Sequence, residues 1–166
     1  VMTSYPSPLE MLNGCKFLDL VRYGEAPEYL DLRVLVHEAR VQPDPVPIDS
    51  GNSDVDRVFA GARPILTKPG YFAFTITFEN YIAFGIRNEI YALPEKHEDF
   101  QKVLRTYDTS AFLDYVQKST SATPNHPGPF THYALICSDH VFDVICQDKP
   151  VVTHALITPE DLQANN

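Results

Sequence analysis

Two residues in the last third of the chain could form a general base. His132 and Asp143 lie in the two apolar runs of the stretch THYALICSDHVFDVIC. A carboxylate that holds an imidazole fixes its tautomer and raises its basicity, which is the arrangement that a general base requires. No nucleophile motif such as GxSxG accompanies the pair. Two interpretations therefore stay open: a catalytic pair, or a cross-strand polar pair on a half-exposed face.

The pair depends on a β-hairpin that the same stretch predicts. A two-residue or a four-residue turn gives the same register, with Ile136 opposite Val141. In that register Asp143 lies opposite Ala134 and diagonal to His132, within reach of a hydrogen bond. The other face of the hairpin is apolar and is expected in the core: Tyr133, Leu135, Cys137, Phe142, Val144 and Cys146.

We expect no metal and no cofactor. His140 lies in the turn of the hairpin, and the register places it on the opposite face from His132 and Asp143. The chain contains no HExxH or HxH spacing. The cysteines, Cys15, Cys137 and Cys146, are odd in number and lack CxxC spacing, which argues against disulfides and a zinc site and fits a reducing compartment. Cys137 and Cys146 lie on the apolar hairpin face and are expected to be packed thiols.

A second candidate site lies in the alternating stretch from 72 to 90. Its even-numbered positions are apolar apart from Asn80 and Asn88, and a single strand of that length is unusual. The pattern predicts a hairpin whose three-residue turn, 79–81, pairs Phe78 with Ile82. In this arrangement Asn88 faces the core and needs hydrogen-bond partners there, which indicates a structural role.

The odd-numbered face of that hairpin is a floor of small residues, with Tyr81 at the turn and Arg87 and Glu89 at the far end. Such a floor lets another group approach the sheet closely, and Arg87 could bind a carboxylate through two hydrogen bonds. That group is a ligand, a partner protein or the chain's own helix over 110–120. The floor consists of Thr75, Thr77, Ala83 and Gly85.

Charge and composition exclude several classes of partner. The 166 residues include 13 basic and 22 acidic side chains, which gives a formal net charge of -9. Such a surface repels phosphate backbones and anionic lipids and attracts a basic protein or a cationic small molecule. No leader segment opens the chain, and no apolar run approaches the roughly 20 residues of a membrane helix. We expect a cytoplasmic protein that binds neither nucleic acid nor membranes.

The predicted elements indicate a single α+β domain over 1–166, with a curved antiparallel sheet of hairpins and one to three short helices. Residues 1–14 are expected to be irregular, and 42–54 form a long proline-rich loop. A short strand is expected over 55–60, and a short helix over 95–104. Further helices are expected over 110–120, capped by Thr109 or Ser110, and at the TPEDLQ stretch near the end.

Three stretches, in order and spacing, resemble a group of small, mostly bacterial proteins of unassigned function. They are ITFENYIAFGIRNE, SAFLDYV and HPGPFTHYALICSDHVFDVI, and they span roughly residues 71–146. The resemblance implies no activity. By size and charge, small acidic proteins of this type resemble immunity or antitoxin-like partners of basic toxins.

The sequence therefore favours a non-enzymatic binding protein that engages a basic protein or a small ligand. The binding residues would be Tyr81, Arg87 and Glu89, or the loop at 42–54. The alternative is a small hydrolase-like or lyase-like enzyme with a general-base pair of His132 and Asp143 and with Arg87 as anion holder. The oligomeric state is left open.

Overall fold

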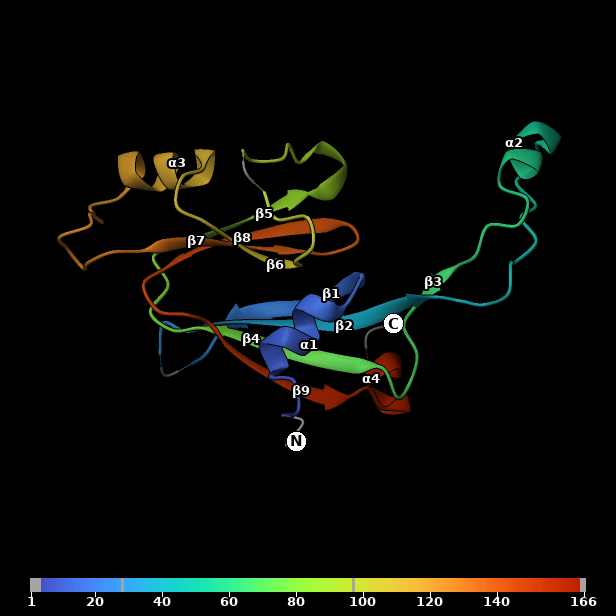
Figure 1. Ribbon diagram of the computed structural model, residues 1–166, viewed down its shortest axis with the longest axis horizontal. Helices are drawn as coiled ribbons and strands as arrows, with labels where there is room; N and C mark the ends of the chain where they lie inside the picture. The colour runs from blue at the N-terminus through green and yellow to red at the C-terminus, as the bar shows by residue number, and fades with distance from the viewer. Residues whose placement is uncertain (1–3, 28, 97, 165–166) are drawn as a thin grey trace.

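The computed structural model describes residues 4–27, 29–96 and 98–164 (Figure 1). Its strands are β1 (Phe17–Glu25), β2 (Leu32–Val41), β3 (Ile65–Leu66), β4 (Phe72–Phe78), β5 (Ala83–Asn88), β6 (Leu104–Tyr107), β7 (Thr131–Ile136), β8 (His140–Cys146) and β9 (Val151–Leu156). Its helices are α1 (Pro8–Gly14), α2 (Ser53–Val58), α3 (Ala111–Ser119) and α4 (Pro159–Gln163), with one 3₁₀ turn, η1 (Glu89–Tyr91).

The strands form two antiparallel sheets that pack as layers (Figure 1). The first sheet has the order β1-β2-β4-β9, and β3 pairs with the end of β2. The second sheet has the order β5-β8-β7-β6. The α+β class is confirmed, but the strands divide between two sheets where one curved sheet was expected, and the described residues hold one helix more than expected.

The hydrophobic core lies between the two sheets. Phe74 and Phe78 of the first sheet and Phe142 of the second have no exposed surface, and each contributes about 1.5–3 kcal/mol by leaving water. Their alternation along each strand follows from the period of two in a β-strand. α1 closes the core at one side: Leu12 is fully buried, and the Asn13 side chain accepts a hydrogen bond from the backbone N–H of Leu104 at 3.0 Å.

The hairpin predicted over 72–90 is wrong. β4 pairs with β2 and β9, whereas β5 pairs with β8, and residues 79–82 carry the chain from one sheet to the other. The even-numbered side chains of both strands do face one core, but from opposite layers. Asn88 is exposed, not buried, and its side chain accepts a hydrogen bond from the N–H of Ile90 at 3.0 Å, which caps η1.

Three other expectations from local sequence need correction. The described part of 1–14 is irregular only over 4–7, because α1 begins after Ser7, whose side chain forms a capping box with Glu10. The strand expected over 55–60 is instead the end of α2, which Asn52 caps, and the turn that follows it. The described part of 95–104 contains no helix.

The helices at the other two predicted places are confirmed. Ser110 caps α3 and Thr158 caps α4. Among the described residues, no helix is long and apolar enough to cross a membrane.

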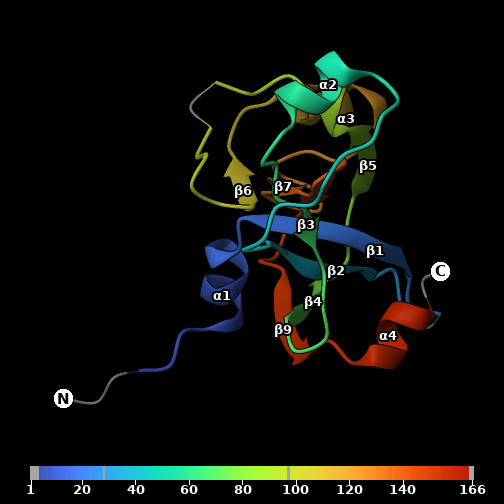
Figure 2. The ribbon, with the colours of Figure 1, turned by 90° about the vertical axis from the view of Figure 1, so that its right-hand side faces the viewer.

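The segment between β2 and β3 forms a projecting arm, which we define as residues 42–64. It runs out from the first sheet to α2 and returns, and it rises to the level of α3 (Figures 1 and 2). Two backbone hydrogen bonds join its legs near the base, Gln42 N–H to the carbonyl of Pro64 at 2.8 Å and Val46 N–H to that of Ala62 at 3.3 Å. The predicted loop at 42–54 is the outgoing leg, which ends where α2 begins.

Candidate functional site

The structure brings His132 and Asp143 together in the predicted register. Ala134 pairs with Asp143 and Ile136 with Val141. His132 Nε2 lies 2.8 Å from Asp143 Oδ1. Both residues are buried, with exposed fractions of 1% and 2%, so the face that carries them is not half-exposed.

Two further side chains extend this pair into a hydrogen-bonded chain. Arg87 of β5 donates from Nε to Asp143 Oδ2 at 2.7 Å and from Nη2 to Oδ1 at 3.1 Å. The Oγ of Ser110 lies 2.7 Å from His132 Nδ1. In the neutral form of the imidazole the proton lies on Nε2, because the carboxylate paired with Arg87 can only accept, and the Ser110 hydroxyl then donates to Nδ1. We call Ser110, His132, Asp143 and Arg87 the buried network.

The first turn of α3 and the last residue of β6 enclose the imidazole of the buried network. Ser110 Oγ accepts a hydrogen bond from the N–H of Leu113 at 3.0 Å, so the residue that reaches His132 also caps α3. The rings of Tyr107 and Phe112 lie 4.9 and 5.4 Å from the imidazole, between ring centroids. Because Ser110, His132 and Asp143 expose so little surface, the network holds α3 on the second sheet and offers a substrate no direct approach to the imidazole.

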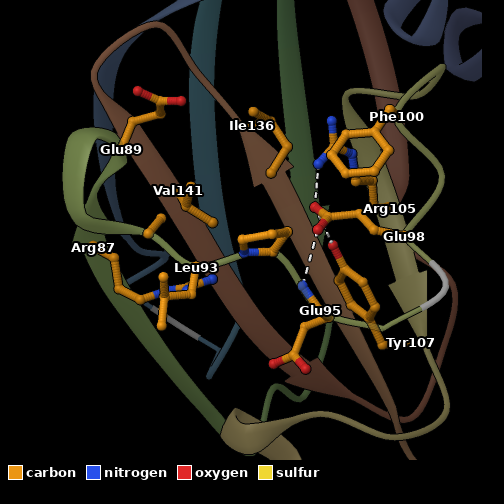
Figure 3. A pocket seen from close by; sticks show the side chains of 12 residues that line it. Arg87, Glu89, Leu93, Glu95, Glu98, Phe100, Arg105, Tyr107, Ile136 and Val141 are labelled. Atoms are coloured by element: carbon orange, nitrogen blue, oxygen red, sulfur yellow. Dashed lines mark hydrogen bonds and ion pairs between the residues drawn. The ribbon is translucent and has the colours of Figure 1, made fainter.

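Arg87 connects the buried network to a cavity on the outer face of the second sheet (Figure 3). Its side chain is 42% exposed. The hydrogen bonds to Asp143 raise the pKa of Arg87, so the guanidinium stays charged. The cavity has a volume of about 280 Å³, and its polar lining consists of Arg87, Glu89, Glu95, Glu98, Arg105 and Tyr107.

Glu98 organises one wall of this cavity. Its carboxylate accepts hydrogen bonds from Arg105, from the hydroxyl of Tyr107 at 2.9 Å and from the N–H of Glu95 at 3.0 Å (Figure 3). Burial, together with this hydrogen bond to Glu98, raises the pKa of Tyr107, so the phenol stays protonated. Glu95 in turn accepts from the N–H of Ala111 at 3.0 Å, which joins the wall to the start of α3.

The cavity is more acidic than basic. Two guanidinium groups line it against three carboxylates. Arg87 and Arg105 are neutralised by Asp143 and Glu98. In the part of the chain that the structure describes, Glu89 and Glu95 form no ion pair, so the net potential in the cavity favours a cation.

Two large apolar side chains that line the cavity and two more in the adjoining η1 are largely exposed to solvent. Their exposed fractions lie between 71% and 81%. Leu93 and Phe100 stand on opposite sides of the cavity (Figure 3), and the other two lie in η1, between the lining residues Glu89 and Ala92. We call this set the rim: Ile90, Tyr91, Leu93 and Phe100.

The three predicted binding residues, Tyr81, Arg87 and Glu89, do not lie at one site. Arg87 and Glu89 line the cavity, but Arg87 pairs with Asp143. Tyr81 precedes the other end of β5, where its hydroxyl donates to the Glu25 carboxylate and its ring packs 5.4 Å from that of Phe84.

The predicted floor of small residues does not exist as one surface, because its halves lie on different sheets. Thr75 and Thr77 belong to β4 in the first sheet, and Ala83 and Gly85 belong to β5 in the second. α3 covers the second half: a Cβ at Gly85 would lie 3.7 Å from the ring of Phe112. The chain's own helix is therefore the group that approaches there.

Sequence reasoning missed the cavity wall and the rim, because Leu93, Glu98 and Phe100 lie in an irregular segment between η1 and β6 whose path no pattern predicts. It identified Ser110 as a helix cap without its bond to His132. The three cysteines are free and buried. Within the described ranges, no group of three or more His, Cys, Asp or Glu side chains could hold a metal ion.

Comparison of this chain with known proteins identifies no relative. No protein-family model matches the chain, and no curated protein and no solved structure matches it significantly. The function must therefore be inferred from the geometry of the site.

Proposed function

We propose that this protein is a non-enzymatic binding protein and that a basic protein docks on its rim. The rim is the observation that carries the proposal. Large apolar side chains gathered at a cavity mouth are typical of protein interaction surfaces, where a few aromatic and aliphatic anchors supply most of the binding free energy. Ile90, Tyr91, Leu93 and Phe100 have this character, and the described chain leaves them uncovered.

The charge of the site indicates the chemistry of the partner. The net charge of -9 steers a basic surface toward this protein. A lysine or arginine side chain of the partner would enter the cavity between Glu89 and Glu95, beside the ring of Tyr107. This partner agrees with the immunity-like or antitoxin-like role that size and charge suggest.

A second candidate function is a small hydrolase-like or lyase-like enzyme that uses the buried network. The hydrogen-bonded order of Ser110, His132 and Asp143 favours it, because a serine hydroxyl that donates to such an imidazole is activated as a nucleophile. The burial of all three residues opposes it. Hydrolysis of a panel of p-nitrophenyl esters, measured for the protein and for His132→Gln, tests it; activity that the substitution abolishes would replace our proposal.

The binding proposal is tested by affinity capture with matched variants. Immobilised protein, Leu93→Asp and Leu30→Asp are exposed to an extract of the native source; Leu30 is the control, since it is 67% exposed and lies outside the rim. Any protein retained is identified, purified and titrated by calorimetry. We expect Leu93→Asp to weaken its binding about 30-fold, which corresponds to the loss of one anchor, and Leu30→Asp to leave it unchanged. A partner that binds both variants equally would contradict the proposal.

Glu89→Gln tests the charge of the partner. The substitution should slow association and weaken its dependence on salt, because it removes one long-range attraction from an exposed position. Stopped-flow association rates at low and high salt measure this. A rate that rises on substitution would mean that the partner is acidic.

A further inference from the structure

The first sheet carries a cavity on its outer face, the side away from the second sheet. α4 lies on this side, so the sheet separates α4 from the second sheet (Figure 2). The cavity has a volume of about 230 Å³ and is lined by His37 at one end. Past Arg22, Leu35 and Thr75 it continues into a second hollow of about 360 Å³, which Arg33 lines. We call the two hollows together the outer trough.

A β-bulge turns Arg22 onto the outer face. Leu20 of β1 pairs with Val36 and faces the core, and strict alternation would point Arg22 the same way. The register shifts by one residue between them, so Arg22 lies opposite Leu35 instead. A bulge redirects side chains in this manner and is a common device beside binding sites.

Three nitrogen-bearing side chains surround Leu35 on the outer face. Arg33 and His37 are its neighbours two residues away along β2, each about 7 Å from it on the same side of the strand. Arg22 lies opposite Leu35 on β1 and therefore diagonal to both. Diagonal positions are about 7–8 Å apart, a distance that a long side chain spans. The two guanidinium groups and the imidazole can thus meet over Leu35.

The floor beside them consists of small side chains from β4 and β9. His37 lies opposite Ala73, which lies opposite Ala155. In the next row Leu35 lies opposite Thr75, which lies opposite Thr153. This floor leaves the space above it open, and its two threonines add hydroxyl groups that can donate or accept hydrogen bonds.

His37 has an unused hydrogen-bonding capacity that faces the trough. The residue is only 4% exposed, and within the described chain its ring forms no hydrogen bond. No completely enclosed polar side-chain atom of the described residues lacks a partner, so the ring nitrogens open on the cavity that His37 lines. Burial lowers the pKa of His37, so the imidazole is neutral near pH 7 and offers one N–H donor.

The two arginines of the trough are also without an ion pair. In the part of the chain that the structure describes, neither Arg22 nor Arg33 forms an ion pair or a side-chain hydrogen bond. This separates them from Arg87 and Arg105, which Asp143 and Glu98 neutralise. An arginine fork without a partner inside its own protein suits an external anion.

One carboxylate faces the trough against these two guanidinium groups. Asp161 of α4 accepts hydrogen bonds from the N–H and the hydroxyl of Thr158 at 2.8 and 3.0 Å, and its charge acts on Arg22 and His37. Glu25 borders the second hollow, but the register places it on the inner side of the sheet, where it accepts a hydrogen bond from Tyr81. The trough therefore keeps a net positive charge.

We propose that the outer trough binds a small organic phosphate, whose phosphate group is held by Arg22, Arg33 and His37. The three terminal oxygens of a phosphate monoester can accept from all three side chains, whereas a carboxylate has only two oxygens. The organic part lies on the floor, over Thr75 and Thr153. A nucleic acid is a poorer match, because its phosphates extend over a wide surface that the net charge of -9 repels.

This site goes beyond the proposed function, because it lies on a different sheet from the rim. The rim and its cavity belong to the outer face of the second sheet and suit a basic protein. The trough belongs to the outer face of the first sheet and suits a small anion. Each site can therefore fail its test without affecting the other.

NMR titration of the ¹⁵N-labelled protein with phenyl phosphate, inorganic phosphate and benzoate tests the site. We expect phenyl phosphate to bind most tightly and to shift the amide signals of β2 and β4 around Leu35 and Thr75. Inorganic phosphate should bind more weakly because it lacks the organic part, and benzoate because it lacks the third oxygen. Absence of phenyl phosphate binding, or benzoate binding that is as tight, would overturn the inference.

Matched arginine variants separate a built site from general surface charge. Arg22→Gln and Arg33→Gln should each weaken phenyl phosphate binding about tenfold, which is the loss of one charge-assisted hydrogen bond. Arg63→Gln is the control, because Arg63 is likewise exposed and forms no ion pair in the described chain, yet lies on the arm. Equal affinities in all three variants would refute the site.

A filled trough provides a test that leaves every charge in place. Thr153→Tyr puts a large ring on the floor, and folding should persist because β9 is an edge strand and tyrosine favours strands. Phenyl phosphate binding should be lost; binding at the wild-type affinity would contradict the inference. Leu93→Asp should bind phenyl phosphate normally, so weakened binding there would also count against a separate site.

Discussion

Two arginine–aspartate pairs of equal length provide a direct test of how burial controls the energy of the buried network. Arg87 Nε lies 2.7 Å from Asp143, and Arg57 Nη2 lies 2.7 Å from Asp54. The side chains of the first pair are 42% and 2% exposed, and those of the second are 79% and 78% exposed. The shortest distances match, but Arg87 donates two hydrogen bonds to Asp143 and Arg57 donates one to Asp54, so a difference between the pairs reports burial together with the second hydrogen bond.

The expected losses of unfolding free energy on replacing the two arginines differ about tenfold. Arg57→Met should cost about 0.3 kcal/mol of unfolding free energy, because water screens the pair. Arg87→Met leaves the carboxylate of Asp143 buried with only His132 as a partner. Breaking a buried pair costs about 3–5 kcal/mol, and the partial exposure of Arg87 places the expected loss near the lower end, at about 3 kcal/mol.

Asp143→Asn should cost less than Arg87→Met. The arginine that it leaves behind can turn to solvent, whereas the carboxylate of Asp143 cannot. The loss is then that of charge-assisted hydrogen bonds, about 2 kcal/mol. The double variant should resemble Asp143→Asn alone, because the second substitution removes a group that has already lost its partner.

Urea unfolding followed by far-UV circular dichroism measures these values in a chain without tryptophan. If Arg87→Met and Arg57→Met agree within about 0.5 kcal/mol, the network contributes no more than a surface pair. If Asp143→Asn is the costlier substitution, the carboxylate is not the group that burial penalises.

Three further predictions concern single groups. Ser110→Ala should cost about 2–3 kcal/mol in urea unfolding, because it removes the cap of α3 and a partner of buried His132; a loss below about 0.5 kcal/mol would contradict this. Burial raises the pKa of the Cys15 thiol to about 11 and that of Cys137 to about 12, so a thiol reagent at mildly alkaline pH should modify them only after unfolding. Burial lowers the pKa of His37 in the folded protein below its ordinary value of 6.5. As the pH falls through 6.5, the unfolded chain therefore binds a proton at His37 more readily than the folded protein does, and the free energy of unfolding should decrease. His37→Gln should reduce this slope in unfolding curves recorded on either side of pH 6.5, and an unchanged slope would exclude His37 as its source.

The features that were predicted correctly are those that depend on residues close together in the sequence. The β7–β8 hairpin was correct in register because its turn is short, and alternation then assigns each side chain to a face. From that register alone, the contact of His132 with Asp143 followed. The caps of α3 and α4 were also predicted correctly, because a capping residue is adjacent in sequence to the helix that it caps.

The incorrect predictions concern features that depend on contacts between residues far apart in the sequence. Alternation over 72–90 shows which side chains share a core, but it does not distinguish neighbours in one sheet from strands that face each other across two. The contact of Arg87 with Asp143 depends on the pairing of β5 with β8, which no local signal indicates. The cavity and rim depend on the path of the segment between η1 and β6, which has no periodicity.

The order of the strands in the two sheets also determines how the chain can fold. The second sheet is encoded in one uninterrupted stretch, 83–146, so all of its pairs form within that stretch. The first sheet pairs β4 with β9 across that entire stretch. Because loop-closure entropy must be overcome before distant contacts form, the second sheet with its buried network can assemble as a unit, and β9 completes the first sheet afterwards. Until then β4 presents an open edge, and the rate at which β9 reaches it sets how long the unfinished molecule can pair with another chain.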